Sequence, residues 1–106
     1  VFIDLENGVA TGGGGTDQLV AIENAFGSAF ADTIYGTKAH GNRLEGNLGN
    51  DTLYGLDGDD TMLGGDGADR LLGGSGVDTM LGGAGDDYID GGRGLDYYNG
   101  GDGADN

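Results

Sequence analysis

The sequence predicts an all-β chain, built as a two-sheet β-solenoid of stacked strands and glycine-rich turns. The first observation is a strict nine-residue period that runs from Gly46 to Asn106. Glycine holds the first and fourth positions of every unit, and the eighth position is apolar or aromatic from Leu53 to Tyr98. The second observation is that aspartate holds the sixth position throughout, at Asp51, Asp60, Asp69, Asp78, Asp87, Asp96 and Asp105. A fixed period of this kind is typical of stacked repeats.

The composition requires an unusual source of stability. The chain has 106 residues, 27 glycines, no proline and a net charge of −15. Glycine loses more conformational freedom on folding than any other residue, and compaction brings like charges together. A core of one apolar residue per repeat does not offset both costs alone. We therefore expect divalent cations to neutralise the carboxylates when the chain folds.

The composition also excludes several classes of partner and site. Only four residues are lysine or arginine, which argues against nucleic acid and against an anionic membrane surface. The absence of cysteine excludes disulfides, iron–sulfur clusters and thiolate zinc sites. No run approaches the length of a membrane span, so we expect no direct membrane insertion.

We expect one continuous domain, with residues 1–45 as its degenerate, capping N-terminal part and residues 46–106 as its regular array. Val1 to Leu5 has the β-branched and aromatic content of a short strand, and Val9 to Thr11 is predicted to return as its partner. Because the chain starts inside a predicted strand and stops in mid-repeat, we interpret it as a fragment of a longer protein.

The repeat is expected to begin before the regular array. Residues 12–20 fit the same template with Asp17 at the sixth position. Residues 21–26 break the period, and their apolar side chains are expected to plug the open end of the stack. The period then returns with Asp32 at the sixth position, and the following unit carries one extra residue and has Asn42 in place of the aspartate.

Each position of the unit has a predicted role in a metal site. Glycines at positions one, two and four let the backbone adopt φ > 0 and expose carbonyl oxygens along one edge. Position six adds a carboxylate there, and positions seven to nine form a short strand with the eighth side chain inward. Two units then make one coil with a turn on each side. Stacking forms two rows of aspartates: Asp51, Asp69, Asp87 and Asp105 on one side, and Asp60, Asp78 and Asp96 on the other.

This donor set favours calcium. Carboxylate and carbonyl oxygens are hard ligands, and a cage of about six oxygens on flexible turns suits Ca²⁺. Mg²⁺ requires a smaller, stricter octahedron and retains its waters, so it fits less well. Zinc and copper lack the imidazole and thiolate ligands that they prefer.

The units resemble the RTX proteins, whose nonapeptide is G-G-x-G-x-D-x-U-x with U a large apolar residue. The unit Gly64-Gly65-Asp66-Gly67-Ala68-Asp69-Arg70-Leu71-Leu72 matches at every defined position, as do the units that start at Gly73 and Gly82. The resemblance implies a right-handed parallel β-roll with Ca²⁺ between successive turns. It also implies that the upper turn gives the carbonyls of positions two and four, and the lower turn those of positions one and three, each with its aspartate.

Carried over to this sequence, the resemblance assigns one site to Gly65, Gly67 and Asp69 with Gly82, Ala84 and Asp87. The next site on the other side takes Gly74, Gly76 and Asp78 with Gly91, Arg93 and Asp96. Across the array, the implied backbone positions are Gly46, Gly49, Gly55, Asp57, Gly58, Gly64, Gly65, Asp66, Gly67, Gly73, Gly74, Ser75, Gly76, Gly82, Gly83, Ala84, Gly85, Gly91 and Arg93.

Departures from the pattern affect individual sites. Asn47 and Leu56 at position two should be tolerated, because the site uses the backbone carbonyl. Asn42 is neutral, so any site that it shares with Asp60 should be weaker. The extra residue before Asn42 leaves a site between Asp32 and Asp51 uncertain. We expect about five Ca²⁺ in the strict array and about seven with the irregular units.

Other acidic and ionisable residues have ordinary explanations. Turn-forming aspartates in a glycine-rich linker would not keep strict register, and no lysine completes a phosphate-binding loop. His40 lies in the irregular loop without a catalytic partner. The aspartates at positions three and five are expected to be solvated and to deepen the negative field: Asp57, Asp59, Asp66, Asp86 and Asp102.

Outward-facing residues leave two interpretations open. Tyr54 and Leu72 are expected on one sheet face and Leu63 and Leu81 on the other, either as scattered surface residues or as a docking face for another domain or subunit.

The function that we predict is a Ca²⁺-dependent folding module rather than an enzyme. The resemblance implies export by a type I route from a Gram-negative bacterium, with folding outside the cell or at its surface. The partners expected are calcium ions and the rest of the parent protein or a neighbouring subunit. The parent remains open between a secreted protease, lipase or polysaccharide epimerase that uses the module as an accessory and a structural or adhesive assembly.

Overall fold

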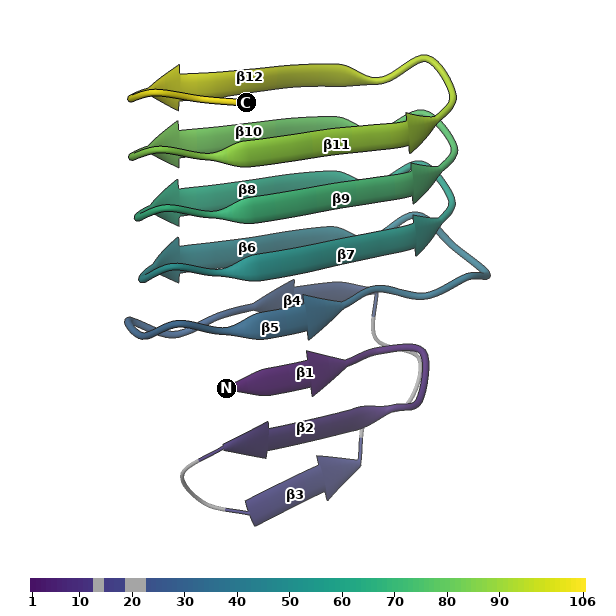
Figure 1. Cartoon of the computed structure of the whole chain (residues 1–106). Helices are drawn as coiled ribbons and strands as arrows, with labels where there is room; N and C mark the ends of the chain where they lie inside the picture. Colours follow the sequence, from purple (N-terminus) through teal and green to yellow (C-terminus); the bar gives the residue numbers. More distant parts are fainter. Residues whose placement is uncertain (13–14, 19–22) are drawn as a thin grey trace.

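A computed structural model of the chain describes residues 1–12, 15–18 and 23–106, without the side chains of residues 15–18. This part of the chain contains strands and turns and no helix, which confirms the all-β prediction. The strands stack in two sheets that face each other (Figure 1). One sheet has the order β11-β9-β7-β5-β1-β2-β3 and the other the order β12-β10-β8-β6-β4. The strands are β1 (Phe2–Asp4), β2 (Val9–Gly12), β3 (Gly15–Gln18), β4 (Asn24–Phe26), β5 (Thr33–Tyr35), β6 (Arg43–Leu48), β7 (Thr52–Asp57), β8 (Thr61–Asp66), β9 (Arg70–Ser75), β10 (Thr79–Ala84), β11 (Tyr88–Arg93) and β12 (Tyr97–Asp102).

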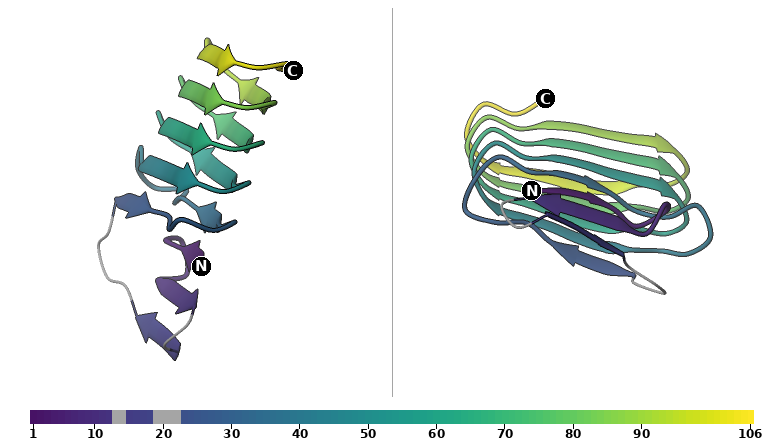
Figure 2. Two further views of the ribbon diagram at one scale, coloured as in Figure 1. Left: turned by 90° about the vertical axis from the view of Figure 1, so that its left-hand side faces the viewer. Right: turned by 90° about the horizontal axis from the view of Figure 1, so that it is seen from below.

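Each coil of the array contains two repeats, as the eighteen-residue spacing predicts. Strands pair in parallel with the strand eighteen residues later, so that Leu53 is opposite Leu71 and Met62 is opposite Met80. The chain therefore alternates between the two sheets as it climbs the stack (Figure 2). Equivalent positions of successive coils lie directly above one another.

The strands of the array are longer than the sequence indicates. β7, for example, spans six residues, from position seven of one unit to position three of the next. Only positions four to six are then left for the turn. The sequence prediction limited the strand to positions seven to nine, because the glycines at positions one and two were attributed to the turn. Instead, the backbone of positions two and three continues the parallel pairing, as Leu56 does with Gly74.

The core is a single file of side chains from position eight. Six of them are fully buried: Ile34, Leu44, Leu53, Met62, Leu71 and Met80. The Cα trace measures 13 Å along its shortest axis, so only one layer of side chains fits between the two sheets. On the last coil described, Ile89 is only partly buried and Tyr98 is 62% exposed.

The first strands form a small antiparallel extension of the seven-stranded sheet. β1 pairs in parallel with β5 and antiparallel with β2, and this confirms the predicted return strand at Val9 to Thr11. Ile3 and Leu5 are buried and lengthen the core. Residues 12–20 fit the repeat template with Asp17 at the sixth position, but the described residues 15–18 do not join the roll as a parallel strand. β3 instead pairs antiparallel with β2, with Asp17 opposite Ala10, because a local hairpin satisfies this backbone without a coil above it.

The irregular units that follow join the stack in register. Within the segment predicted to plug the end, residues 21–22 lie outside the described residues, and β4 pairs with β6 so that Ala25 enters the core. Ile34 and Leu44 are fully buried at the eighth position of their units. The extra residue between Asp32 and Asn42 is thus accommodated in a turn.

Candidate metal centre

The sixth-position aspartates form two rows, one along each edge of the roll, and the aspartates from Asp51 to Asp87 are buried. The backbone N–H of each aspartate donates to Oδ1 of the aspartate eighteen residues later. In the Asp51 row, the N–H of Asp51 lies 2.7 Å from Oδ1 of Asp69, and the N–H of Asp69 lies 2.9 Å from Oδ1 of Asp87. In the other row, the same contact is 2.9 Å from Asp60 to Asp78 and 3.0 Å from Asp78 to Asp96. The predicted pairing of aspartates at eighteen-residue separation is therefore present.

The second carboxylate oxygen of these aspartates has no partner. Oδ2 is buried and accepts no hydrogen bond from any described residue in Asp51, Asp60, Asp69, Asp78 and Asp87. A buried charged oxygen without a donor is costly and needs an explanation such as an ion. Five such atoms in strict register indicate a repeated site for a cation.

A backbone carbonyl faces each of these oxygens across a small space. A Cβ atom on Gly64 would lie within 3.0 Å of both Oδ2 of Asp69 and the carbonyl oxygen of Gly82 in the next coil. The same pair of oxygens, Oδ2 of the sixth-position aspartate and a carbonyl oxygen of the next coil, recurs beside Gly27, Gly46, Gly55, Gly64, Gly73 and Gly82. Position one is therefore glycine because a side chain would fill this space. The predicted left-handed backbone at position one is wrong, since positive φ occurs at positions two and four instead.

Positions two and four direct their carbonyl oxygens toward the next turn. The φ angles of Gly65 and Gly67 are 112° and 141°, a region that favours glycine. The carbonyl oxygens of Asn47 and Gly49 lie against these two glycines, where no Cβ could fit. Leu56 likewise has a positive φ of 82°, so a side chain at position two is accommodated at the cost of backbone strain.

The carbonyls of position three are already used between coils. The carbonyl oxygen of Ala84 accepts the N–H of Gly67 at 2.7 Å, and that of Arg93 accepts the N–H of Gly76 at 2.9 Å. The same bond joins Gly58 to Ser75 at 2.8 Å. A carbonyl oxygen has two lone pairs, so these atoms remain able to contact a cation as well.

Burial in the two rows disfavours the charged form of the aspartate side chains. Burial raises the pKa of Asp60 and Asp69 to about 6; the backbone hydrogen bond to each works in the other direction, and nearby aspartates add to the rise. Burial also raises the pKa of Asp51, Asp78 and Asp87 above the usual value. Near neutral pH, a cation beside these aspartates would therefore stabilise their carboxylate form, which burial destabilises.

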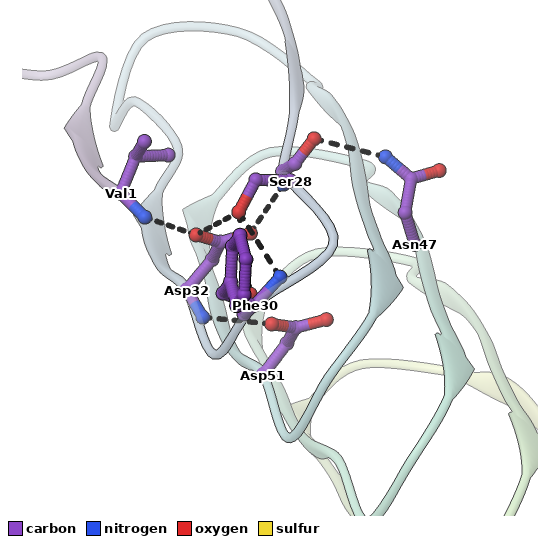
Figure 3. Close-up of polar contacts among 7 residues, drawn as sticks. Val1, Ser28, Phe30, Asp32, Asn47 and Asp51 are labelled. Carbon is purple, nitrogen blue, oxygen red and sulfur yellow. Dashed lines mark hydrogen bonds and ion pairs between the residues drawn. The ribbon is translucent and has the colours of Figure 1, made fainter. Parts of the chain in front are cut away.

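The two irregular turns satisfy their sixth-position side chains without a cation. Figure 3 shows Oδ2 of Asp32 accepting the backbone N–H of Ser28, while Oδ1 accepts the Ser28 hydroxyl at 3.0 Å and contacts the Val1 amino group. The N–H of Asp32 lies 2.7 Å from Oδ1 of Asp51, so the extra residue does not disturb this pair. Neither oxygen of Asp32, however, is left without a donor.

Both polar atoms of the Asn42 side chain also have hydrogen-bond partners within the protein. Its Oδ1 accepts the backbone N–H of Thr37 at 2.7 Å and the Thr37 hydroxyl at 3.3 Å, and its Nδ2 donates to the carbonyl of Glu23 at 3.1 Å. Ser28 and Thr37 both stand at position two, and our sequence analysis missed them. The available signal was a hydroxyl residue at a position where most of the regular units have glycine.

Three further residues that were predicted to bind metal, Asp17, Asp57 and Asp66, do not belong to the two rows of sixth-position side chains. The described part of Asp17 lies in a strand, away from both rows of turns. Asp57 and Asp66 are exposed, and the carbonyl oxygen of Asp66 accepts the N–H of Gly49 at 2.9 Å. Within residues 1–12, 15–18 and 23–106, no three His, Cys, Asp or Glu side chains gather as a metal cluster. Any ion in this roll would thus rely on backbone carbonyls as well as paired aspartates.

Comparison with known proteins agrees with this geometry. The family model for the RTX calcium-binding nonapeptide repeat matches the chain over residues 22–38, 37–71 and 72–106. Together, these segments cover most of the chain. A comparison with curated proteins gave no match.

Proposed function

We propose a calcium-dependent folding role for this chain, which belongs to the RTX calcium-binding nonapeptide repeat family. Members of the family bind Ca²⁺ through these repeats. For this chain, we assign about five ions, one for each pair of adjacent aspartates in the regular array. The pairs are Asp51 with Asp69, Asp69 with Asp87, Asp87 with Asp105, Asp60 with Asp78, and Asp78 with Asp96.

The observation that carries this proposal is the set of five buried Oδ2 atoms without a donor. Each faces a carbonyl oxygen of the next coil across a space that only glycine leaves open. Oxygen donors without imidazole or thiolate suit a hard cation. The irregular turns at Asp32 and Asn42 receive no ion in this assignment, because protein donors already fill their place.

Binding and folding are coupled in this mechanism. The chain has a net charge of −15, and the buried rows add aspartates whose pKa is raised by burial. Without Ca²⁺, repulsion within the rows and the entropy of 27 glycines favour an open chain. About five Ca²⁺ supply roughly ten positive charges, which lets the turns stack and the position-eight side chains become buried.

The setting we propose is outside the cell, in a protein secreted by a type I route or held at the surface of a Gram-negative bacterium. Family membership supports this setting, because RTX repeats are typical of secreted bacterial proteins. Calcium sites of extracellular modules bind in the range of about 10⁻⁴ to 10⁻³ M, which would keep the chain open at cytosolic calcium levels. No helix in the described ranges is long and apolar enough to cross a membrane.

The test is circular dichroism of the chain with chelator and then with Ca²⁺ in the millimolar range. We expect a change from coil to β-structure on adding Ca²⁺ that is reversed by the chelator. Mg²⁺ at the same concentration and ionic strength is the control, and it should produce little of this change. A chain that is fully folded in chelator and indifferent to Ca²⁺ would refute the proposal.

A further inference from the structure

Position five carries a second set of contacts between coils. The side-chain Oδ1 of Asn50 accepts the backbone N–H of Ala68 at 2.9 Å, eighteen residues later. Oδ1 of Asp59 accepts the N–H of Val77 at 2.8 Å in the same way. Oδ1 of Asp86 accepts the N–H of Ala104 at 2.9 Å. We call these three contacts the position-five clamps.

The clamps give Asp59 and Asp86, which were expected only to be solvated, an additional contact with the next coil. Both side chains are exposed, yet each holds a backbone donor of the next coil. Asn50 makes the same bond without a charge. The shared property is therefore an acceptor oxygen on a short side chain, and a carboxylate is not required. This separates position five from position six, where the unpartnered oxygen always belongs to an aspartate.

Each clamp lies one residue from a proposed ion site. Val77 donates to Asp59, and the next residue, Asp60, donates its own N–H to Oδ1 of Asp78. The two turns are thus joined by two adjacent hydrogen bonds that run in opposite directions. Such a pair fixes both the height and the tilt of one turn on the other, and these determine the distance between the oxygens that would share an ion.

We propose that the acceptors at position five, Asn50, Asp59 and Asp86, are positioning residues that hold two turns at the spacing required for Ca²⁺. The proposal rests on the calcium assignment above. It separates the five sites into two groups. The sites at Asp51/Asp69, Asp60/Asp78 and Asp87/Asp105 have a clamp, whereas those at Asp69/Asp87 and Asp78/Asp96 have Ala68 or Val77 at the same place and have none.

The test compares Asp59→Asn with Asp59→Ala in the full chain by calcium titration against a chromophoric chelator. Asp59→Asn keeps the acceptor and loses a charge that acts on Asp60 and Asp78, so we expect its calcium affinity at that site to fall less than that of Asp59→Ala. Asp59→Ala loses the acceptor, and one site should weaken about fivefold while the number of ions at saturation stays the same. The reciprocal variant Ala68→Asn supplies an acceptor for the N–H of Asp86 and should strengthen one site by a similar factor.

The outcomes separate this proposal from the calcium assignment. If the wild-type chain binds no Ca²⁺, the proposed function itself is wrong. If the wild type binds but Asp59→Asn weakens as much as Asp59→Ala, then charge is what matters and the clamp is refuted. Loss of one ion in Asp59→Ala would make Asp59 a ligand and also overturn the proposal. Should Asp59→Ala fail to fold, Ala68→Asn still decides, because unchanged affinity there contradicts the clamp.

Discussion

Replacing Asp69 by asparagine should have opposite effects with and without calcium. Asp69 lies in the middle of its row, and its Oδ1 accepts the N–H of Asp51 at 2.7 Å. An asparagine can keep this bond through its own Oδ1. The change is then confined to Oδ2, the buried atom without a donor, where an NH₂ group would stand instead. Asp69→Asn therefore removes one charge and one cation ligand at nearly constant shape.

The size of the effect on ion number follows from how the aspartates are shared. Asp69 belongs to two proposed sites, one with Asp51 and one with Asp87, so about five bound ions should fall to about three. Asp96 belongs to one site, with Asp78, so Asp96→Asn should leave about four. The two variants make the same chemical change at different places in a row and are matched controls for each other.

In chelator the sign reverses. Burial raises the pKa of Asp69 to about 6, and the charges of its row neighbours add to that rise. The charged carboxylate thus destabilises the metal-free roll at pH 7, and a neutral amide removes this penalty. Asp69→Asn should be more ordered than wild type in chelator and less stable than wild type in Ca²⁺.

The assays are ion counting after equilibrium dialysis and thermal unfolding followed by circular dichroism, in Ca²⁺ and in chelator. Equal losses of ions in the two variants would refute the sharing of Asp69 between two sites. A loss of stability in chelator as large as that in Ca²⁺ would show that Asp69 acts through its hydrogen bonds alone.

Three further predictions concern pH, backbone strain and the core. Burial holds the pKa of Asp60 and Asp69 at about 6, above the unfolded value of 3.8. Their contribution to the stability of the metal-free roll is therefore present below pH 4 and is lost as pH rises through 6. Circular dichroism in chelator should show more β-structure at pH 5 than at pH 7.5, and equal β-structure at the two pH values would contradict this prediction. Leu56→Gly should stabilise the calcium-loaded roll by about 1 kcal/mol in thermal unfolding because φ is +82°, whereas Leu56→Ala, which keeps a Cβ, should not. Met80→Ala should lower the free energy of unfolding by about 2–5 kcal/mol because Met80 is fully buried. Tyr98→Ala, at the equivalent but exposed position, should change it by about 0.5 kcal/mol or less. Similar losses of stability in the two variants, measured by thermal unfolding, would contradict the single-file core.

The period of the regular array was enough to predict the coil, the core and the aspartate rows. Each of these depends on a side chain that a repeat places at one fixed height, such as Leu53 over Leu71. A chain that alternates one inward apolar residue with a turn has few other ways to bury it. Pairing at eighteen residues then follows, and so does the contact from Asp51 to Asp69.

The reason for each glycine did not follow from the sequence. Glycine at position one can indicate either a positive φ or a lack of space for a side chain, and the amino-acid sequence is the same in both cases. Only the atoms around Gly64 show that Oδ2 of Asp69 and a carbonyl of the next coil occupy the place of a side chain. Similarly, Asp17 matched the template by spacing, but its backbone pairs with the preceding strand. Hairpin pairing is local, so it competes with a coil wherever the next repeat is imperfect.

The buried sixth-position side chains obtain a partner in two different ways, which correlate with the residue at position two. From Asp32 to Asp87, every sixth-position side chain is buried beside a turn, and its side-chain oxygens need partners. Where position two carries a hydroxyl residue, at Ser28 and Thr37, the backbone N–H of that residue donates to Oδ2 of Asp32 or Oδ1 of Asn42, so the partner comes from the protein itself. Where position two has no hydroxyl, as at Gly65, the oxygen of Asp69 has no protein donor. Calcium dependence should therefore begin at the regular array and not at the first buried aspartate, so the first coil can serve as a metal-independent base on which the calcium-bound coils stack.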